Sequence, residues 1–326
     1  MMKKYWVFPL VILTALGFWV AVIIRRLTNP RAVFNNPQKG KPKPGLSSRV
    51  IDSGGIKRGF LLYVPSGYKP GVPLPLVLNL HGFASSASGQ MHLSRWEKLA
   101  EKENFCVIYP QGTGSPLRWN ASRDFTISAV DDVSFIQEVI QAAGMLLDID
   151  PSRIYVSGMS NGGSMTARLA WELPGIFAAA GIVSAPPIDL AQYNDSTRPI
   201  PLIAFYGTAD PLVKYEGGMI NLSPLTRLLR LSTHHIKFPP VRQWIETWVK
   251  RNGASASPKP IALCEQIIGL YYSGRVEASE VEFYAIIGGG HTWPGGAPTF
   301  IGKTNRFIDA TVEMWEFFKR HSTAAK

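Results

Sequence analysis

The segment Gly158-Met159-Ser160-Asn161-Gly162 places a serine between two glycines in the pattern G-x-S-x-G. It follows a strand-like run, RIYVS, and precedes a helix-like run, GGSMTARLAWEL. In this setting the turn is so tight that a Cβ at either glycine would collide with neighbouring backbone, and the serine Oγ is pushed outward. Because the bare pattern is common in a chain rich in glycine and serine, the prediction depends mainly on the flanking strand and helix. The segment predicts that Ser160 is a nucleophile for acyl transfer.

A serine nucleophile needs a base to take its proton and a carboxylate to hold that base in the right tautomer. After such a turn the expected chain order is serine, then Asp or Glu, then His. Asp210 lies in GTADP after the strand-like run PLIAFY, and His291 lies in GGGHTWPGG after EFYAII. We therefore expect His291 to be the general base and Asp210 its orienting acid. Four other histidines lie in polar or helical settings, where solvated or packed roles are expected: His92, His234, His235 and His321.

The developing oxyanion needs preorganised N–H donors, normally one from the residue after the nucleophile and one from the loop after the third strand. Asn161 directly follows the serine, and the turn His81-Gly82-Phe83 follows the apolar run LPLVLNL. We expect the backbone N–H groups of Asn161 and Phe83 to form the oxyanion hole, and His81 to order the turn. An ordinary glycine turn at the end of a strand is the alternative for this segment.

Apolar, β-branched runs alternate with helical patterns from about residue 56, which is typical of βα units that build a mostly parallel sheet. The expected strands are residues 58–64, 76–80, 105–109, 153–156, 178–184, 202–206 and 281–287. The expected helices are residues 96–103, 132–147, 163–172, 241–250 and 310–320. The sequence has no internal repeat, so one α/β domain from about residue 48 onward is expected.

The first 45 residues differ from the rest of the chain in hydropathy and charge. Residues 5–24, YWVFPLVILTALGFWVAVII, form an uncharged run of twenty, long enough as a helix for a hydrocarbon core of about 30 Å. We expect one uncleaved transmembrane anchor, because the run continues to Arg25-Arg26. The alternative is a cleaved signal peptide, with Lys3-Lys4 as its basic region and residues 15–17 as the cleavage site. The expected organisation is an anchor or signal peptide over residues 1–27, a linker over 28–47 and a catalytic domain over 48–326.

The net charge of +11 is concentrated in this leader. Residues 1–45 hold eight of the 34 basic residues and no acidic residue, which leaves 26 positive against 23 negative side chains in the remainder. A nucleic-acid partner is therefore not expected, whereas the membrane is, through the N-terminal helix. Two lysines precede the apolar run and six basic residues follow it, which favours a cytoplasmic C-terminal side.

The chain has only two cysteines, Cys106 and Cys264. They show neither a metal-ligand spacing nor a disulfide framework, and Cys106 falls inside an expected strand. We expect two ordinary thiols, and no metal or other cofactor.

Eight segments between about residues 74 and 321 form a series: LPLVLNLHG, FCVIYPQG, WN at 119–120, DDVSFI, RIYVSGMSNGGSMTARLAWELPGIFAAAGIVSA, YGTADPLVKYEGG, GGGHTWPGG and IDATVEMWEFFKRH. This series resembles the α/β-hydrolase serine esterases that include the poly(3-hydroxybutyrate) depolymerases and the feruloyl and acetylxylan esterases. The resemblance implies an α/β-hydrolase fold, with a doubly wound, mostly parallel sheet flanked by helices. It implies the same roles for Ser160, His291 and Asp210. It also favours an extracytoplasmic catalytic domain, against the charge count, or a secreted one if the leader is cleaved.

The sequence departs from this family at two places. Where many relatives carry cysteines, the chain has residues 252–254, Asn-Gly-Ala, and residues 273–275, Ser-Gly-Arg, so the disulfide of a secreted relative is not expected. Residues 219–240 look longer than the equivalent loop and are basic and apolar, which suggests a lid or a membrane-facing flap.

We therefore expect carboxylic-ester hydrolysis through an acyl-enzyme, on a hydroxybutyrate-type polyester or on feruloyl or acetyl esters. Trp119 and Trp293 are expected to line the substrate, with packing as the alternative role. A serine peptidase or thioesterase on the same fold is the alternative within enzymology, because a triad does not determine the leaving group. A membrane-tethered binding protein without catalysis is the alternative of another class. Its signature would be a missing triad residue, and none is missing.

Overall fold

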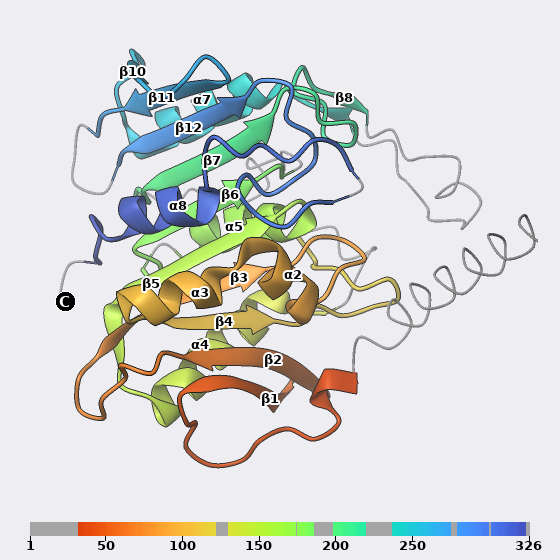
Figure 1. The fold of residues 1–326 in the computed structure, drawn as a ribbon, viewed down its shortest axis with the longest axis vertical. Helices are drawn as coiled ribbons and strands as arrows, with labels where there is room; N and C mark the ends of the chain where they lie inside the picture. The colour runs from red at the N-terminus through yellow and green to blue at the C-terminus, as the bar shows by residue number, and fades with distance from the viewer. Residues whose placement is uncertain are drawn as a thin grey trace, which may run out of the picture.

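The computed structural model describes residues 32–121, 130–173, 175–185, 198–219, 237–274, 279–299 and 301–323. Its centre is a ten-stranded sheet with the order β1-β2-β4-β3-β5-β6-β7-β12-β11-β10 (Figure 1). The strands of this sheet are β1 (Gly45–Ser53), β2 (Ile56–Val64), β3 (Leu74–Leu80), β4 (Cys106–Pro110), β5 (Ile149–Met159), β6 (Ala179–Val183), β7 (Leu202–Gly207), β10 (Lys259–Ile261), β11 (Ile267–Tyr272) and β12 (Val281–Ile286). A separate ribbon pairs β8 (Gly218–Met219) with β9 (Lys237–Phe238).

The six strands in the middle of the sheet, from β4 to β12 in spatial order, are parallel to one another. The strands at both edges pair antiparallel. Strand β3 is buried along its whole length, as expected where helices cover both faces of a parallel sheet. The predicted mostly parallel α/β sheet is therefore confirmed, and all seven predicted strands are present.

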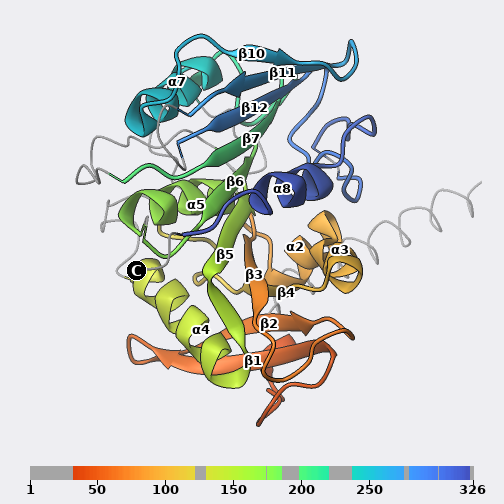
Figure 2. The same ribbon diagram turned by 90° about the vertical axis from the view of Figure 1, so that its left-hand side faces the viewer.

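Helices cover both faces of the sheet, as Figure 2 shows. One face carries α4 (Asp132–Leu146), α5 (Asn161–Glu172) and α7 (Val241–Asn252), and the other carries α2 (Ala87–Ser94), α3 (Trp96–Glu103) and α8 (Ala310–Phe318). Each face has its own apolar core, with Phe135, Trp171 and Trp248 on the first side and Trp96 and Trp315 on the second. The five predicted helices are confirmed, and α2 is an addition.

The described chain begins with a short 3₁₀ helix, η1 (Ala32–Phe34), followed by β1. The Phe34 ring packs directly on Gly59, where a Cβ would lie 2.6 Å from the ring. The Gln38 N–H donates to the Ser48 carbonyl at 2.9 Å. Strand β1 begins at Gly45, inside the expected linker over residues 28–47, because these residues pair with β2.

The expected transmembrane segment, residues 5–24, lies outside the described residues, as does the whole stretch 1–31. Within the ranges that the structure describes, no helix is both long enough and apolar enough to cross a bilayer. Most of the expected lid, residues 220–236, also lies outside the described residues.

Candidate active site

Ser160 occupies the turn between β5 and α5. Its φ of 54° and ψ of −125° are rare for a residue with a side chain. The turn is held by the Ser160 N–H, which donates to the Val183 carbonyl at 2.9 Å. The predicted strand, turn and helix are thus confirmed around this serine.

The two flanking glycines are required by close backbone contacts. A Cβ on Gly158 would overlap the carbonyl oxygen of Gly162, and a Cβ on Gly162 would overlap the carbonyl oxygens of Leu80 and His81. Overlaps with backbone cannot be relieved by a change of rotamer. The predicted reason for glycine at both positions is confirmed, and Gly162 also brings the end of β3 close to the turn.

His291 and Asp210 are in direct contact at the same edge of the sheet. His291 Nδ1 lies 2.8 Å from Asp210 Oδ2, and both residues are buried. The other carboxylate oxygen, Oδ1, accepts the N–H groups of Leu212 and Val213, each at 2.8 Å. An ionised carboxylate can only accept, so a neutral imidazole in this contact carries its proton on Nδ1 and has Nε2 as its acceptor. The sequence-predicted acid and base are therefore brought together.

The loops after β7 and β12 are packed tightly enough to fix this contact. The Ala209 N–H donates to the Gly289 carbonyl at 3.0 Å, and the Gly288 N–H donates to Thr208 Oγ1 at 2.9 Å. A Cβ on Gly207 would overlap the Gly289 carbonyl oxygen. The glycines before His291 thus let its loop turn back onto the loop that carries Asp210.

Ser160 lies at the same carboxyl edge as this pair, because β5, β6, β7 and β12 run parallel and are successive neighbours. Strands about 4.8 Å apart place the ends of β5 and β7 roughly 10 Å from each other, which a loop side chain can bridge. In the described part of the chain no hydrogen bond joins Ser160 Oγ to His291. Such contacts are often long before substrate binds.

The turn over residues 81–83 lies beside the serine. A Cβ on Gly82 would be in ordinary contact with the Ser160 Cβ, at 3.4 Å. The Phe83 side chain is exposed, and its backbone N–H donates to no described residue. The N–H of Asn161 opens α5, where the first helical N–H groups have no acceptor within the helix. Asn161 thus directly follows the serine in the chain, and Phe83 directly follows the glycine that lies beside it.

His81 is buried and neutral, and its tautomer follows from its two contacts. Nε2 accepts the Gly112 N–H at 2.9 Å, so Nδ1 carries the proton and donates to the Gly82 carbonyl at 2.8 Å. Burial, assisted by the nearby Arg58 charge, lowers the pKa of His81 to about 4. As expected, His81 orders the turn.

His81 is expected to make folding sensitive to acid. In the unfolded chain its pKa is near 6.5, so between pH 6.5 and 4 the unfolded chain binds the extra proton and the folded protein does not. Stability contributed by the neutral imidazole is therefore lost as pH falls, by about 3 kcal/mol over this window. Denaturant unfolding at pH 4 to 7 should show a shallower pH slope for His81→Gln than for the wild type. Equal slopes for the two proteins would contradict this assignment.

The two tryptophans expected to line the substrate are buried instead. Trp119 is 2% exposed and its Nε1 donates to the His81 carbonyl at 2.8 Å. Trp293 is 0% exposed and its Nε1 donates to Thr311 Oγ1 at 2.9 Å. The expectation of a substrate wall is corrected to packing and hydrogen bonding for both residues, because neither ring has a free face.

A metal ion and a reactive cysteine are two alternatives to a serine nucleophile. Among the residues described, no cluster of three or more His, Cys, Asp or Glu side chains could hold a metal ion. Burial raises the pKa of Cys106 to about 12, so this thiol stays protonated at neutral pH. Cys106 therefore offers no alternative nucleophile.

One family model and several curated relatives match this chain, and their names are those of esterases or depolymerases. A family model described as "Esterase PHB depolymerase" matches residues 58–196, less than half of the chain. "Putative esterase NocK" of Nocardia uniformis subsp. tsuyamanensis is 29% identical over 296 residues, which cover 83% of this chain and 82% of NocK. "Feruloyl esterase B" of Piromyces equi is 29% identical over 245 residues, 72% of this chain and 42% of that enzyme.

Among solved structures, the "Acetyl xylan esterase from Aspergillus awamori" superposes with a TM-score of 0.58 at 17% identity. The match covers 84% of this chain and 99% of that chain. At this identity the likeness shows the fold alone. With the mostly parallel sheet it confirms the predicted α/β-hydrolase fold.

Proposed function

We propose that this chain, a carboxylic ester hydrolase of the serine esterase type, cleaves its substrate through an acyl-enzyme on Ser160. It resembles the poly(3-hydroxybutyrate) depolymerases, feruloyl esterases and acetylxylan esterases. The observation that carries the proposal is the 2.8 Å contact between His291 Nδ1 and Asp210 Oδ2, at the edge of the sheet where the turn after β5 places the half-buried Ser160.

The first half-reaction forms the acyl-enzyme. Ser160 Oγ attacks the carbonyl carbon while His291 Nε2 accepts its proton, and the resulting imidazolium is stabilised by Asp210. The carbonyl oxygen becomes an oxyanion, which the backbone N–H groups of Asn161 and Phe83 hold. His291 then returns the proton to the leaving alcohol as the C–O bond breaks.

The second half-reaction releases the acid. Water loses a proton to His291 Nε2 and attacks the acyl carbon, and the same N–H donors hold the second oxyanion. His291 then protonates Ser160 Oγ as the acyl C–O bond breaks. The enzyme returns to its starting protonation state with no cofactor in either step.

The substrate class follows from resemblance. Poly(3-hydroxyalkanoate) depolymerase, feruloyl esterase and acetylxylan esterase are the names of relatives, so a hydroxybutyrate-type polyester and feruloyl or acetyl esters are the candidate substrates. Assays of the purified protein on these esters, short aryl esters, peptides and acyl thioesters would rank them. A preference for peptides or thioesters would overturn the ester assignment.

A fluorophosphonate tests the nucleophile directly, because it reacts with an activated serine and leaves a stable mass increase. We expect one label per chain on the tryptic peptide that contains Ser160, with loss of p-nitrophenyl acetate hydrolysis in parallel. Inactivation without a label on Ser160, or a label on another serine, would contradict the proposal.

We also propose that residues 5–24 tether the catalytic domain to a membrane, because this uncharged run is long enough to span one. The resemblance to the esterase family, against the charge count, favours the extracytoplasmic side for the domain. Protease added to intact cells is then expected to digest the catalytic domain. Protection of the domain until the cells are broken open would reverse the proposed orientation.

A further inference from the structure

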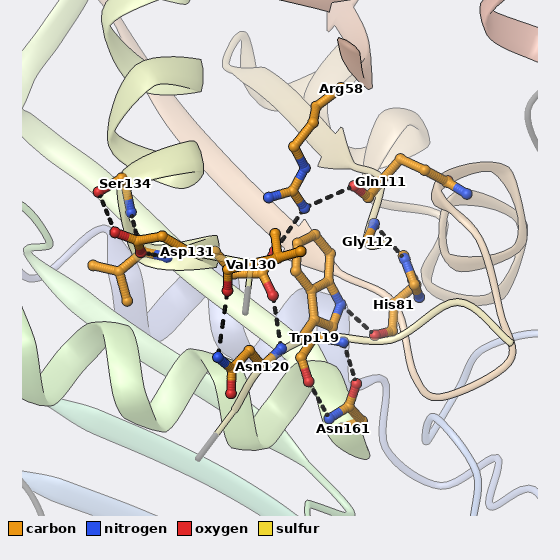
Figure 3. Close-up of polar contacts among 12 residues, drawn as sticks. Arg58, His81, Gln111, Gly112, Trp119, Asn120, Val130, Asp131, Ser134 and Asn161 are labelled. Atoms are coloured by element: carbon orange, nitrogen blue, oxygen red, sulfur yellow. Dashed lines mark hydrogen bonds and ion pairs between the residues drawn. The ribbon is translucent and has the colours of Figure 1, made fainter. Parts of the chain in front are cut away.

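A buried ion pair joins a residue near the start of β2 to the first residue of α4, and Figure 3 shows Arg58 of this pair with the residues around it. Arg58 Nη2 lies 2.6 Å from Asp132 Oδ1, and both side chains are 1% exposed. The Arg58 guanidinium also covers the Phe135 ring, at 3.6 Å from its centroid. Removing two charges from water is costly, so such a pair is weak evidence for stability, and a role in positioning other groups is the better explanation for it.

One arm of hydrogen bonds runs from Asp132 to the residue after the nucleophile. Asp132 Oδ2 accepts the N–H of Asn120 at 2.6 Å, which fixes the backbone next to Trp119. The Trp119 N–H donates to Asn161 Oδ1 at 2.7 Å, and Asn161 Nδ2 donates to the Trp119 carbonyl at 3.1 Å. The Asn161 side chain thus forms a two-bond clamp on Trp119 while its backbone N–H remains available.

A second arm runs from Arg58 to the other proposed oxyanion donor. Arg58 Nη2 donates to the Gln111 carbonyl at 3.3 Å, and the next residue, Gly112, donates its N–H to His81 Nε2 at 2.9 Å. His81 in turn donates to the Gly82 carbonyl, directly before Phe83. This arm fixes the turn that carries the Phe83 N–H.

Trp119 joins the two arms, as Figure 3 shows. Its indole Nε1 donates to the His81 carbonyl at 2.8 Å, and its ring lies beside the His81 ring with centroids 5.0 Å apart. Its backbone belongs to the Asn161 clamp. One residue therefore contacts both segments that supply an oxyanion donor, although these segments come from different elements.

We propose that Trp119 and the Asn161 side chain are positioning residues, which set the separation of the Phe83 and Asn161 N–H groups and are anchored by the Arg58–Asp132 pair. This assignment rests on the proposed ester hydrolysis at Ser160. Oxyanion donors act on charge that develops only in the transition state, so their misplacement lowers kcat more than it raises KM. A displacement of about 1 Å can lower the rate about 100-fold.

The test uses Trp119→Phe in the full chain, which keeps an aromatic ring and removes the N–H donor to His81. We expect kcat for p-nitrophenyl acetate to fall about tenfold or more, with KM within twofold of the wild type. The inhibition constant of phenylboronic acid, whose tetrahedral serine adduct places an oxygen in the same hole, should rise by a similar factor.

The matched control is Trp315→Phe. Trp315 is also buried, and its Nε1 donates to Glu103 Oε2 at 3.0 Å. It belongs to the apolar core on the other face of the sheet from the core that contains Trp119. This variant is expected to lower thermal stability with kcat and boronate affinity unchanged. Equal losses of kcat in both variants would show a general structural effect and overturn the proposal.

Asn161→Ala is a second, independent variant, because it retains the backbone N–H and removes only the clamp. It should lower kcat with little change in KM, and the double variant with Trp119→Phe should lose less than the product of the two single losses. Wild-type kcat and boronate affinity in both single variants would overturn the proposal. Failure of the proposed function would look different: the wild type itself would show no Ser160-dependent ester hydrolysis, and the positioning roles would fall with it.

Discussion

Replacing Ser160 with alanine is expected to lower kcat/KM for p-nitrophenyl acetate by at least about 10⁴-fold, because no other group can form the acyl-enzyme. The variant keeps the Cβ that lies beside Gly82, and alanine at this position must adopt the same positive φ as serine. Its thermal unfolding should therefore stay within a few degrees of the wild type. Steady-state kinetics together with a melting curve would measure both effects.

Ser184→Ala is the matched control for this experiment. Ser184 directly follows β6, the parallel neighbour of β5, and has a similar positive φ of 45°. Its N–H donates to the Phe205 carbonyl at 2.9 Å, a backbone contact that alanine preserves. We expect near wild-type hydrolysis from Ser184→Ala. Retention of activity by Ser160→Ala, or an equal loss in both variants, would refute the assignment of the nucleophile.

Local requirements explain why much of the site could be predicted from sequence. The glycines at 158 and 162 are dictated by overlaps within one turn, and that turn is visible in the flanking strand and helix patterns. The pairing of Asp210 with His291 spans 81 residues, yet it follows from two parallel strands whose carboxyl ends meet at one edge. The chain order of the two residues and the parallel direction of their strands can both be predicted from the sequence.

Roles that depend on distant partners were not predictable in this way. Trp119 follows a turn in the sequence, and nothing local distinguishes a ring that faces substrate from one that donates to a carbonyl 38 residues away. Arg58 appeared only as a residue of an expected strand, since its partner Asp132 lies 74 positions further along the chain. The proposed positioning network is therefore a tertiary feature.

Two missed elements have the same cause. Helix α2 (ASGQMHLS) has weak intrinsic helix propensity. It is capped by Ser86, and Gln90 and Ser94 both donate to Asn79 Oδ1 on β3 at 2.9 Å. Strand β1 (GLSSRVIDS) is mostly polar and exists because it pairs along its whole length with β2. Tertiary contacts thus stabilise both elements, although the local sequence pattern of each is weak.

The second large effect is expected for Asp210→Asn, which should lower kcat/KM at neutral pH by about 10³- to 10⁴-fold. The N–H groups of Leu212 and Val213 must still be accepted, so the amide oxygen of the asparagine takes the place of Oδ1. Its Nδ2 then faces His291 Nδ1 as a donor. Nδ1 must become the acceptor, and the imidazole proton moves to Nε2, where the Ser160 proton can no longer be received.

Asp309→Asn separates this tautomer effect from simple loss of a carboxylate. Asp309 Oδ1 accepts the N–H groups of the residues two and three positions later, Thr311 and Val312, as Asp210 Oδ1 does, but Asp309 orients no catalytic imidazole. This variant should retain activity with only a small loss of stability. The amide preserves the side-chain shape and the backbone hydrogen bonds in both variants. The large loss of activity is therefore expected only at Asp210, where the replaced carboxylate oxygen accepts a hydrogen bond from a histidine. Comparable activity of Asp210→Asn and wild type would mean that His291 does not depend on Asp210 for its tautomer.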